Sequence, residues 1–101
     1  MERRIHEFIP EIKDYYTITS NGEIYSDNSG LMKTRDRKGT EYQIINLSKL
    51  DGKKRTFRVH RLVMMAFNPV ENMDELEVNH LDGNKKNNKL ENLEWCTASE
   101  N

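Results

Sequence analysis

The sequence predicts an α+β protein, with a small antiparallel sheet in its first part and one helix after it. Three observations predict this class. β-branched and aromatic residues flank Asn21-Gly22, a dipeptide typical of tight hairpin turns. Apolar residues then recur with a helical period over residues 59–67. Further along, two strand-like runs at 77–80 and 93–97 enclose a polar loop.

The predicted N-terminal sheet rests on four short runs rich in β-branched and aromatic residues. The first two flank Asn21-Gly22 and are expected to pair as a hairpin. The last two flank a second turn at Asp51-Gly52. We therefore expect a basic antiparallel module over residues 1–58. The four runs are residues 15–19, 23–26, 42–47 and 56–59.

The predicted helix begins near residue 59 and ends before Pro69, because a residue that precedes proline is disfavoured in the α conformation. Its apolar stripe consists of Val59, Leu62, Val63, Ala66 and Phe67. The helix and the loop after it, 59–75, are expected to connect the sheet to a third segment, 76–101. In that segment Asp82-Gly83-Asn84 is a turn signature, and Ser99 is placed to open a helix as its N-cap.

Composition excludes several classes of protein. The 101 residues suit one domain or two small modules. No apolar run reaches the roughly 20 residues that span a bilayer, and the first residues have no signal-peptide character, so we expect an intracellular protein without membrane contact. The single cysteine excludes a disulfide framework and a multi-cysteine zinc site.

Charge is unevenly distributed although the net charge is only −1. Residues 1–32 carry a net −3, residues 33–61 a net +7 and residues 62–101 a net −5. Such a basic stretch is expected to bind the phosphates of double-stranded DNA; a solvated hairpin surface is the alternative. The expected DNA-binding residues are Lys33, Arg35, Arg37, Lys38, Lys53, Lys54, Arg55, Arg58 and Arg61.

The segment from Val78 to the end resembles the HNH (ββα-metal) nuclease motif in the form carried by phage and intron-encoded homing endonucleases. The matching text is His60-Arg61-Leu62-Val63, Val78-Asn79-His80-Leu81-Asp82-Gly83-Asn84-Lys85, Asn87-Asn88, Glu91-Asn92-Leu93-Glu94-Trp95, and Thr97 with Ser99-Glu100-Asn101. Upstream, residues 16–26 resemble a short DNA-binding module often fused to these nucleases. The resemblance implies a DNA-nicking enzyme encoded by a phage or mobile element and acting in the cytoplasm of a bacterial host.

The resemblance also implies roles for individual residues. His80 is the expected general base, because an imidazole titrates near neutral pH. Asn92 is expected to hold the loop by hydrogen bonds and to orient His80. Asn79 and Asn101 are the expected ligands of one divalent cation, Mg²⁺ or alternatively Mn²⁺. For Asp82 a turn role is favoured over metal binding.

Two departures from the family pattern keep an alternative open. Asn79 is a neutral amide where many members have aspartate, which weakens attraction for a cation. The chain stops at Asn101, so we expect the motif to be truncated before its helix and its activity to be low. The alternative is a catalytically inactive, shortened protein that acts as a DNA- or protein-binding regulator or inhibitor, with the acidic stretch 71–82 facing a protein partner. We expect a monomer in either case.

Overall fold

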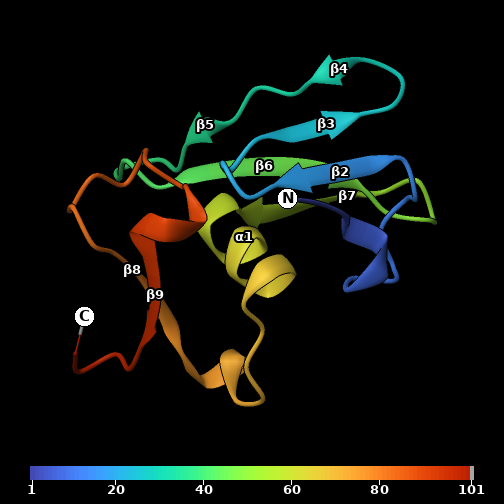
Figure 1. Ribbon diagram of the computed structural model, residues 1–101. Helices are drawn as coiled ribbons and strands as arrows, with labels where there is room; N and C mark the ends of the chain where they lie inside the picture. The colour runs from blue at the N-terminus through green and yellow to red at the C-terminus, as the bar shows by residue number, and fades with distance from the viewer. Residues whose placement is uncertain (101) are drawn as a thin grey trace.

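Nine strands, one α-helix and three 3₁₀ helices form within residues 1–100, the part of the chain that this computed structural model describes (Figure 1). The α-helix, α1, spans Val59–Phe67. The 3₁₀ helices are η1 Ile5–Glu7, η2 Met73–Glu75 and η3 Leu90–Asn92. The strands are β1 Glu2–Arg4, β2 Tyr16–Thr19, β3 Ile24–Ser26, β4 Gly30–Leu31, β5 Arg35–Asp36, β6 Gln43–Ser48, β7 Lys54–Arg58, β8 Glu77–His80 and β9 Leu93–Cys96.

The strands form three antiparallel sheets, in the orders β1-β2-β3-β4, β5-β6-β7 and β8-β9. The α+β class is confirmed, but the expected single N-terminal sheet is two sheets. Hydrogen bonds connect these two sheets. The amide of Ser48 donates a 2.9 Å hydrogen bond to the Tyr16 hydroxyl, and Ile12 forms an isolated antiparallel β-bridge with Lys49. Strands β1, β4 and β5 were not expected; each has only two or three residues and is held by pairing with another strand.

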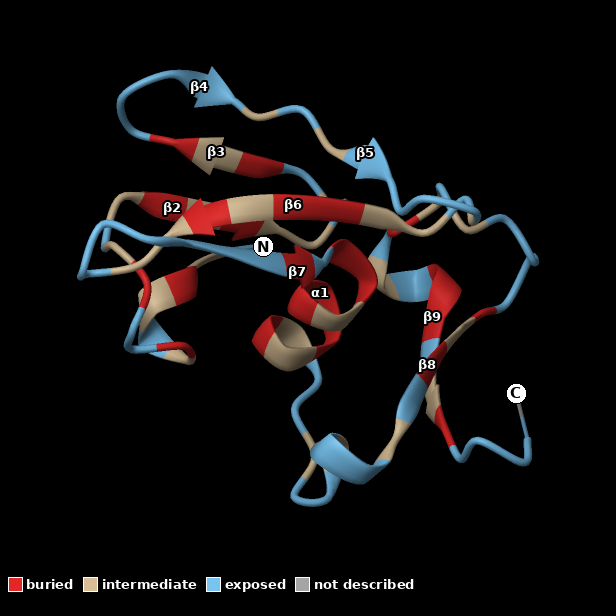
Figure 2. Cartoon of the chain, turned by 180° about the vertical axis from the view of Figure 1, so that it is seen from behind, coloured by how far each residue is buried: buried red, intermediate tan, exposed pale blue. Residues whose placement is uncertain are grey.

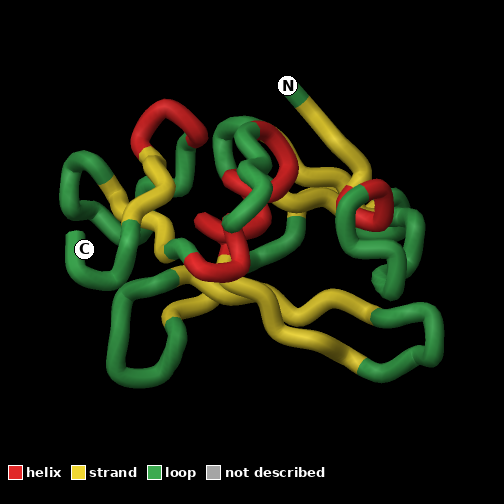
Figure 3. The backbone as a smooth tube through the Cα atoms, turned by 90° about the horizontal axis from the view of Figure 1, so that it is seen from below, coloured by secondary structure: helices red, strands yellow, loops and turns green. Residues whose placement is uncertain are grey.

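Helix α1 packs against the sheets through the face that carries its apolar stripe. It contacts β2, β6, β7, β8 and β9, and its buried side faces these strands in Figure 2. Seen from below, it lies between the β8–β9 ribbon and the first sheet (Figure 3). Beyond its C-terminal end, the Trp95 indole N–H donates a 2.7 Å hydrogen bond to the carbonyl of Asn68. The helix therefore connects the N-terminal sheets to the ribbon.

One hydrophobic cluster runs through all three parts of the described chain. Val78 and Leu93 bring the β8–β9 ribbon into the same cluster as α1 and the N-terminal sheets. The side chains that are fully buried are Ile5, Ile12, Ile18, Ile24, Leu47, Val59, Leu62, Val63 and Met64. Within residues 1–100, none of the helices has the length and apolar character needed to cross a bilayer.

Candidate active site

The β8–β9 ribbon positions the two neighbouring residues Asn79 and His80. The register pairs Asn79 with Glu94 and His80 with Leu93. Side chains alternate along a strand, so the two residues point to opposite faces. His80 lies on the buried face with Val78 and only 6% of it is exposed, whereas Asn79 is partly exposed. The strand thus presents His80 toward α1 and Asn79 away from it.

The His80 ring is held by one hydrogen bond and by neighbouring rings. Its Nε2 atom lies 2.8 Å from Oδ1 of Asn88, which is also buried. An amide oxygen only accepts hydrogen bonds, so Nε2 carries the proton and the lone pair of the neutral ring is on Nδ1. The rings of His60 and Tyr42 lie beside it, with centroids 5.3 Å and 6.0 Å from the His80 centroid. With Asn88 Oδ1 as the acceptor, the tautomer with its proton on Nε2 is favoured, and the neighbouring rings restrict the plane of the His80 ring.

Asn88 is the functional candidate to which the sequence assigned no role. It lies in the polar loop between β8 and β9 and is 7% exposed, unusually low for a loop asparagine. The Asn87-Asn88 pair within the matched motif was the available signal, but the sequence does not say which amide reaches the histidine. The structure brings Asn88 to His80 and directs Asn87 toward Asp82.

Asn92 organises the loop that follows His80. Its side-chain amide donates 2.9 Å hydrogen bonds to Asp82 Oδ1 and to the carbonyl of Asn87. Its oxygen accepts a 3.1 Å hydrogen bond from the Asp82 amide. These contacts are on the loop, while the ring of His80 bonds to Asn88. Orientation of His80 by Asn92 therefore stays a prediction, and any such effect acts through the loop.

Asp82 is the acceptor at the centre of this loop. Hydrogen bonds from the Asn87 side chain, the Asn84 amide and the Asn92 side chain hold the pKa of its carboxyl below the ordinary value. The Asn84 amide lies 2.8 Å from Asp82 Oδ1, which closes a turn on the aspartate side chain. The carboxylate at this position thus serves the turn.

His60, at the second position of α1, faces His80. The two rings are nearly parallel, with an interplanar angle of 18°, and only 6% of His60 is exposed. Its Nδ1 atom is buried without a hydrogen-bond partner among the described residues. Burial, followed by the charges on His80, Arg58 and Arg61, lowers the pKa of His60 to about 3. His60 is therefore neutral at physiological pH.

The candidate ligands for a divalent cation are side-chain oxygens on the β8–β9 ribbon. Nδ2 of Asn79 donates a 3.0 Å hydrogen bond to Glu94 Oε1, which directs the Asn79 amide oxygen away from that carboxylate. Amide oxygens are suitable ligands for Mg²⁺ or Mn²⁺, so the Asn79 amide oxygen fits one position in the coordination sphere of such an ion. Asn101 lies outside the described residues. Within residues 1–100, no three His, Cys, Asp or Glu side chains gather in a group that could hold a metal.

The nine basic residues expected to bind DNA are in different environments. The Arg61 guanidinium donates hydrogen bonds of 2.7 Å and 3.0 Å to the carbonyls of Leu76 and Met73 and lies over the Trp95 ring. Arg55 forms an ion pair with Glu11, and Arg35 donates to Asn46. Arg61 is half-buried, whereas Arg35, Arg55 and the other six are exposed; these six are Lys33, Arg37, Lys38, Lys53, Lys54 and Arg58.

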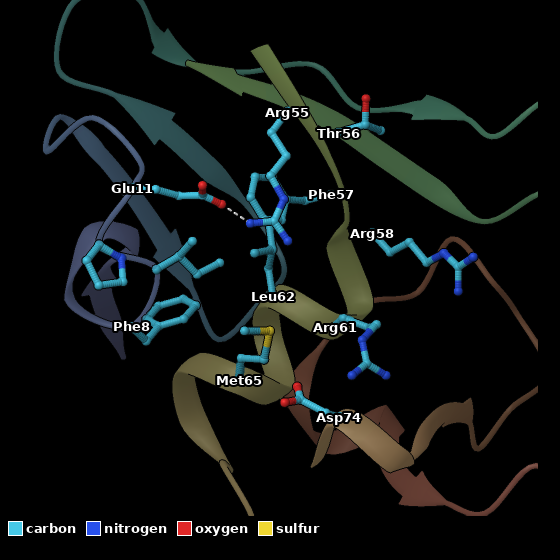
Figure 4. A pocket seen from close by; sticks show the side chains of 12 residues that line it. Phe8, Glu11, Arg55, Thr56, Phe57, Arg58, Arg61, Leu62, Met65 and Asp74 are labelled. Carbon is cyan, nitrogen blue, oxygen red and sulfur yellow. Dashed lines mark hydrogen bonds and ion pairs between the residues drawn. The ribbon is translucent and has the colours of Figure 1, made fainter. Parts of the chain in front are cut away.

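A groove of about 730 Å³ lies between the Phe8–Glu11 segment, β7 and α1 (Figure 4). Phe8, Phe57 and Met65 give it apolar walls, and the Glu11–Arg55 ion pair lies beside them. A second hollow of about 480 Å³ is lined by Tyr42, His60 and Arg58, among others. His80 and Asn79 are not among the residues found to line either space. His80 is therefore packed behind His60, which itself lines the second hollow.

Comparisons with known proteins agree on one family. Residues 57–101 match a family model described as HNH endonuclease. The chain is 46% identical over 90 residues to an uncharacterized HNH endonuclease, L245, of Acanthamoeba polyphaga mimivirus, covering 87% of this chain and 26% of that protein. It is 42% identical over 95 residues to the DNA endonuclease I-HmuI of Bacillus phage SP01, covering 90% of this chain and 53% of that protein.

A comparison of folds identifies the same family. A solved structure described as DNA binding and cleavage by the HNH homing endonuclease I-HmuI superimposes with a TM-score of 0.81 and 35% identity, covering 99% of this chain and 54% of that chain. The chain thus spans about a quarter to a half of the length of these relatives. The similarity includes the N-terminal sheets as well as the segment that carries His80.

Proposed function

The chain belongs to the HNH endonuclease family, and from this premise we propose that it binds double-stranded DNA and nicks one phosphodiester bond with the help of one divalent cation. His80 is the general base in this proposal. The observation that carries it is the hydrogen bond of 2.8 Å between His80 Nε2 and Asn88 Oδ1. Because Nε2 holds its proton there, the lone pair that can accept a proton from water is on Nδ1.

The reaction needs two proton transfers and the exchange of one phosphorus–oxygen bond for another. His80 Nδ1 takes a proton from water while the water oxygen attacks phosphorus and the bond from phosphorus to the leaving oxygen breaks. The leaving oxygen then takes a proton from solvent. A bound Mg²⁺ or Mn²⁺ supplies compensation for the negative charge that develops on the phosphate oxygens. Asn79 would hold the ion through its amide oxygen, and Glu94 orients that amide.

The exposed basic residues support binding to the DNA backbone. Lys54 and Arg58 project from the same face of β7, because alternate residues of a strand point the same way. Thr56 between them is hydrogen-bonded to Asn46 on β6, 2.6 Å away. A polar, positively charged sheet face of this kind suits contacts with phosphates. We propose that the protein works as a monomer in the cytoplasm of a phage-infected bacterium.

A supercoiled plasmid tests the proposal directly. Nicking is expected with Mg²⁺ or Mn²⁺ and none with EDTA, and His80→Ala should lower the rate by about 10²–10⁴-fold. His6→Ala, on η1, is the matched histidine control and should leave the rate unchanged. DNA affinity measured in parallel should be the same for both variants. A His80→Ala protein that nicks at the wild-type rate would contradict the assignment.

The second candidate function is binding without cleavage, as a regulator or inhibitor. The neutral amide of Asn79, which attracts a cation less strongly than a carboxylate would, favours it. It predicts DNA binding that does not respond to Mg²⁺ and no nicking under any of the three conditions. The acidic stretch 71–82 is then the proposed contact for a protein partner.

A further inference from the structure

The turn between β2 and β3 lies directly against the loop that carries Asn88. Gly22 has a positive φ of +83°, and a Cβ atom built on it would lie 2.7 Å from the Asn88 carbonyl oxygen and 2.9 Å from the Asn88 Cβ. The amide of Leu90 also donates a 2.8 Å hydrogen bond to the carbonyl of Ser20. The hairpin and the loop are therefore in contact, and the backbone of Gly22 approaches Asn88 more closely than any other residue type would allow.

Asn88 transmits this contact to His80. Its Cβ meets the turn, and its Oδ1 holds the Nε2 proton of His80. Because Asn88 is buried, a push on its backbone or Cβ cannot be absorbed by rotation into solvent. The β2–β3 turn is thus in contact with the residue that supplies the acceptor for the histidine ring.

A second contact from the N-terminal part reaches the same ring. Tyr42, in the segment before β6, has its ring centroid 5.3 Å from that of His60 and 6.0 Å from that of His80. Tyr42, Gly22 and Ser20 all lie outside residues 57–101, the part matched by the family model. The surroundings of His80 are therefore completed by residues that precede the nuclease motif.

We propose that the β2–β3 turn, Ser20–Gly22, is a positioning element for the catalytic base: it fixes Asn88, and through Asn88 the tautomer and plane of the His80 ring. This rests on the proposed role of His80. It gives the N-terminal sheet a function in the chemistry in addition to any function in DNA binding. A base that is displaced by about 1 Å can lose about two orders of magnitude in rate, so such positioning has a measurable effect.

The other glycines provide matched controls. Gly30 also has a positive φ, +77°, but a Cβ there would meet nothing within 4 Å. Alanine at either position carries a similar backbone strain, whereas the collision with Asn88 is confined to Gly22. Comparing Gly22→Ala with Gly30→Ala therefore separates displacement of Asn88 from loss of stability at a turn.

The experiment measures single-turnover nicking at saturating DNA, DNA affinity, and the ¹⁵N signals of the His80 ring. Gly22→Ala should lower the nicking rate about 10- to 100-fold, with DNA affinity within twofold of wild type and the ring nitrogen signals shifted toward a mixture of tautomers. Gly30→Ala should leave the rate and the ring signals unchanged. Equal rates and equal ring signals for the two variants would overturn the proposal.

A double-mutant cycle tests whether the effect passes through Asn88. In an Asn88→Ala background, Gly22→Ala should cause no further loss of rate, because the acceptor is already gone; a full additional loss would overturn the proposal. If Gly22→Ala does not fold, Gly22→Asn against Gly30→Asn repeats the comparison, since asparagine tolerates positive φ and keeps the colliding Cβ. If the wild-type protein does not nick, the proposed function fails, and the ¹⁵N signals alone decide the positioning role.

Discussion

The imidazole of His60 stacks on the imidazole of His80, with ring centroids 5.3 Å apart and planes 18° from parallel. A buried ring nitrogen without a partner, as at His60 Nδ1, ordinarily costs about 1–3 kcal/mol of folding free energy. A phenylalanine could provide the flat surface without that cost. The stack therefore holds the His60 ring against the His80 ring. Because the buried ring is a titratable histidine, it also makes the stability of the protein depend on pH.

The pKa of about 3 for His60 predicts that the protein loses stability in mild acid. In the unfolded chain a histidine titrates near pH 6.5, so between these two values the unfolded state binds more protons than the folded state. The free energy of unfolding should thus fall as the pH falls, by about 2 kcal/mol from this residue between pH 7 and pH 5. Urea unfolding at pH 5, 6 and 7 measures the change.

His60→Phe is the control for that measurement, because it keeps a flat ring and removes the titrating group. Its unfolding free energy should decline less than that of the wild type over the same range. Parallel pH profiles for the two proteins would show that His60 is not the residue responsible.

Arg61 is expected to act in folding. Arg61→Ala leaves the carbonyls of Leu76 and Met73 without the guanidinium and removes the contact with the Trp95 ring. We expect a loss of about 1–3 kcal/mol in the free energy of unfolding, measured by urea titration. Arg58→Ala, one turn away and exposed, should change it by less than about 0.5 kcal/mol. Equal effects of the two substitutions would contradict the distinction.

The exposed basic residues on β7 are expected to set the salt dependence of DNA binding. Lys54→Ala and Arg58→Ala should each reduce the slope of log affinity against log salt by about 0.9, because each removes one neutralised phosphate. Fluorescence anisotropy with a duplex from 50 to 200 mM salt measures the slope. Lys13→Ala, outside the basic stretch, should leave the slope unaltered. A slope that is insensitive to both β7 substitutions would place the DNA elsewhere.

Local signals predicted the elements that are stabilised locally. The hairpin around Asn21-Gly22 is confirmed by the pairing of Ile18 with Ile24, because the turn residues themselves specify that geometry. The helix at Val59–Phe67 is confirmed for a similar reason, since its apolar stripe matches the buried face. Strands β1 and β5 had no such signal: each has only two or three residues, and its order comes from pairing with β2 or β6.

The candidate site was predictable in its chemistry and less so in its contacts. The residues of the motif pointed to His80. The path of the loop decides which of its asparagine side chains reaches the ring, so Asn88 had no predicted role. Charge density alone could not separate Arg61, which binds main-chain carbonyls, from exposed Arg58. The approach of Gly22 to Asn88 joins segments more than sixty residues apart, and no local pattern encodes it.

The last prediction concerns the loop held by Asn92. Asn92→Ala removes hydrogen bonds to Asp82 and to the Asn87 carbonyl at a position that is only 8% exposed. Each hydrogen bond that is lost contributes about 0.5–1.5 kcal/mol, so the free energy of unfolding should fall by about 1–3 kcal/mol and amide exchange in residues 81–92 should accelerate. Asn72→Ala, at an exposed asparagine before η2, is the control and should do neither. Because Asn88 lies in the same loop, the nicking rate of Asn92→Ala should fall together with the loop's protection from exchange. If amide exchange accelerated while the nicking rate stayed unchanged, the hydrogen bonds of Asn92 would not be needed to position His80. The contact between Gly22 and Asn88 would then be sufficient.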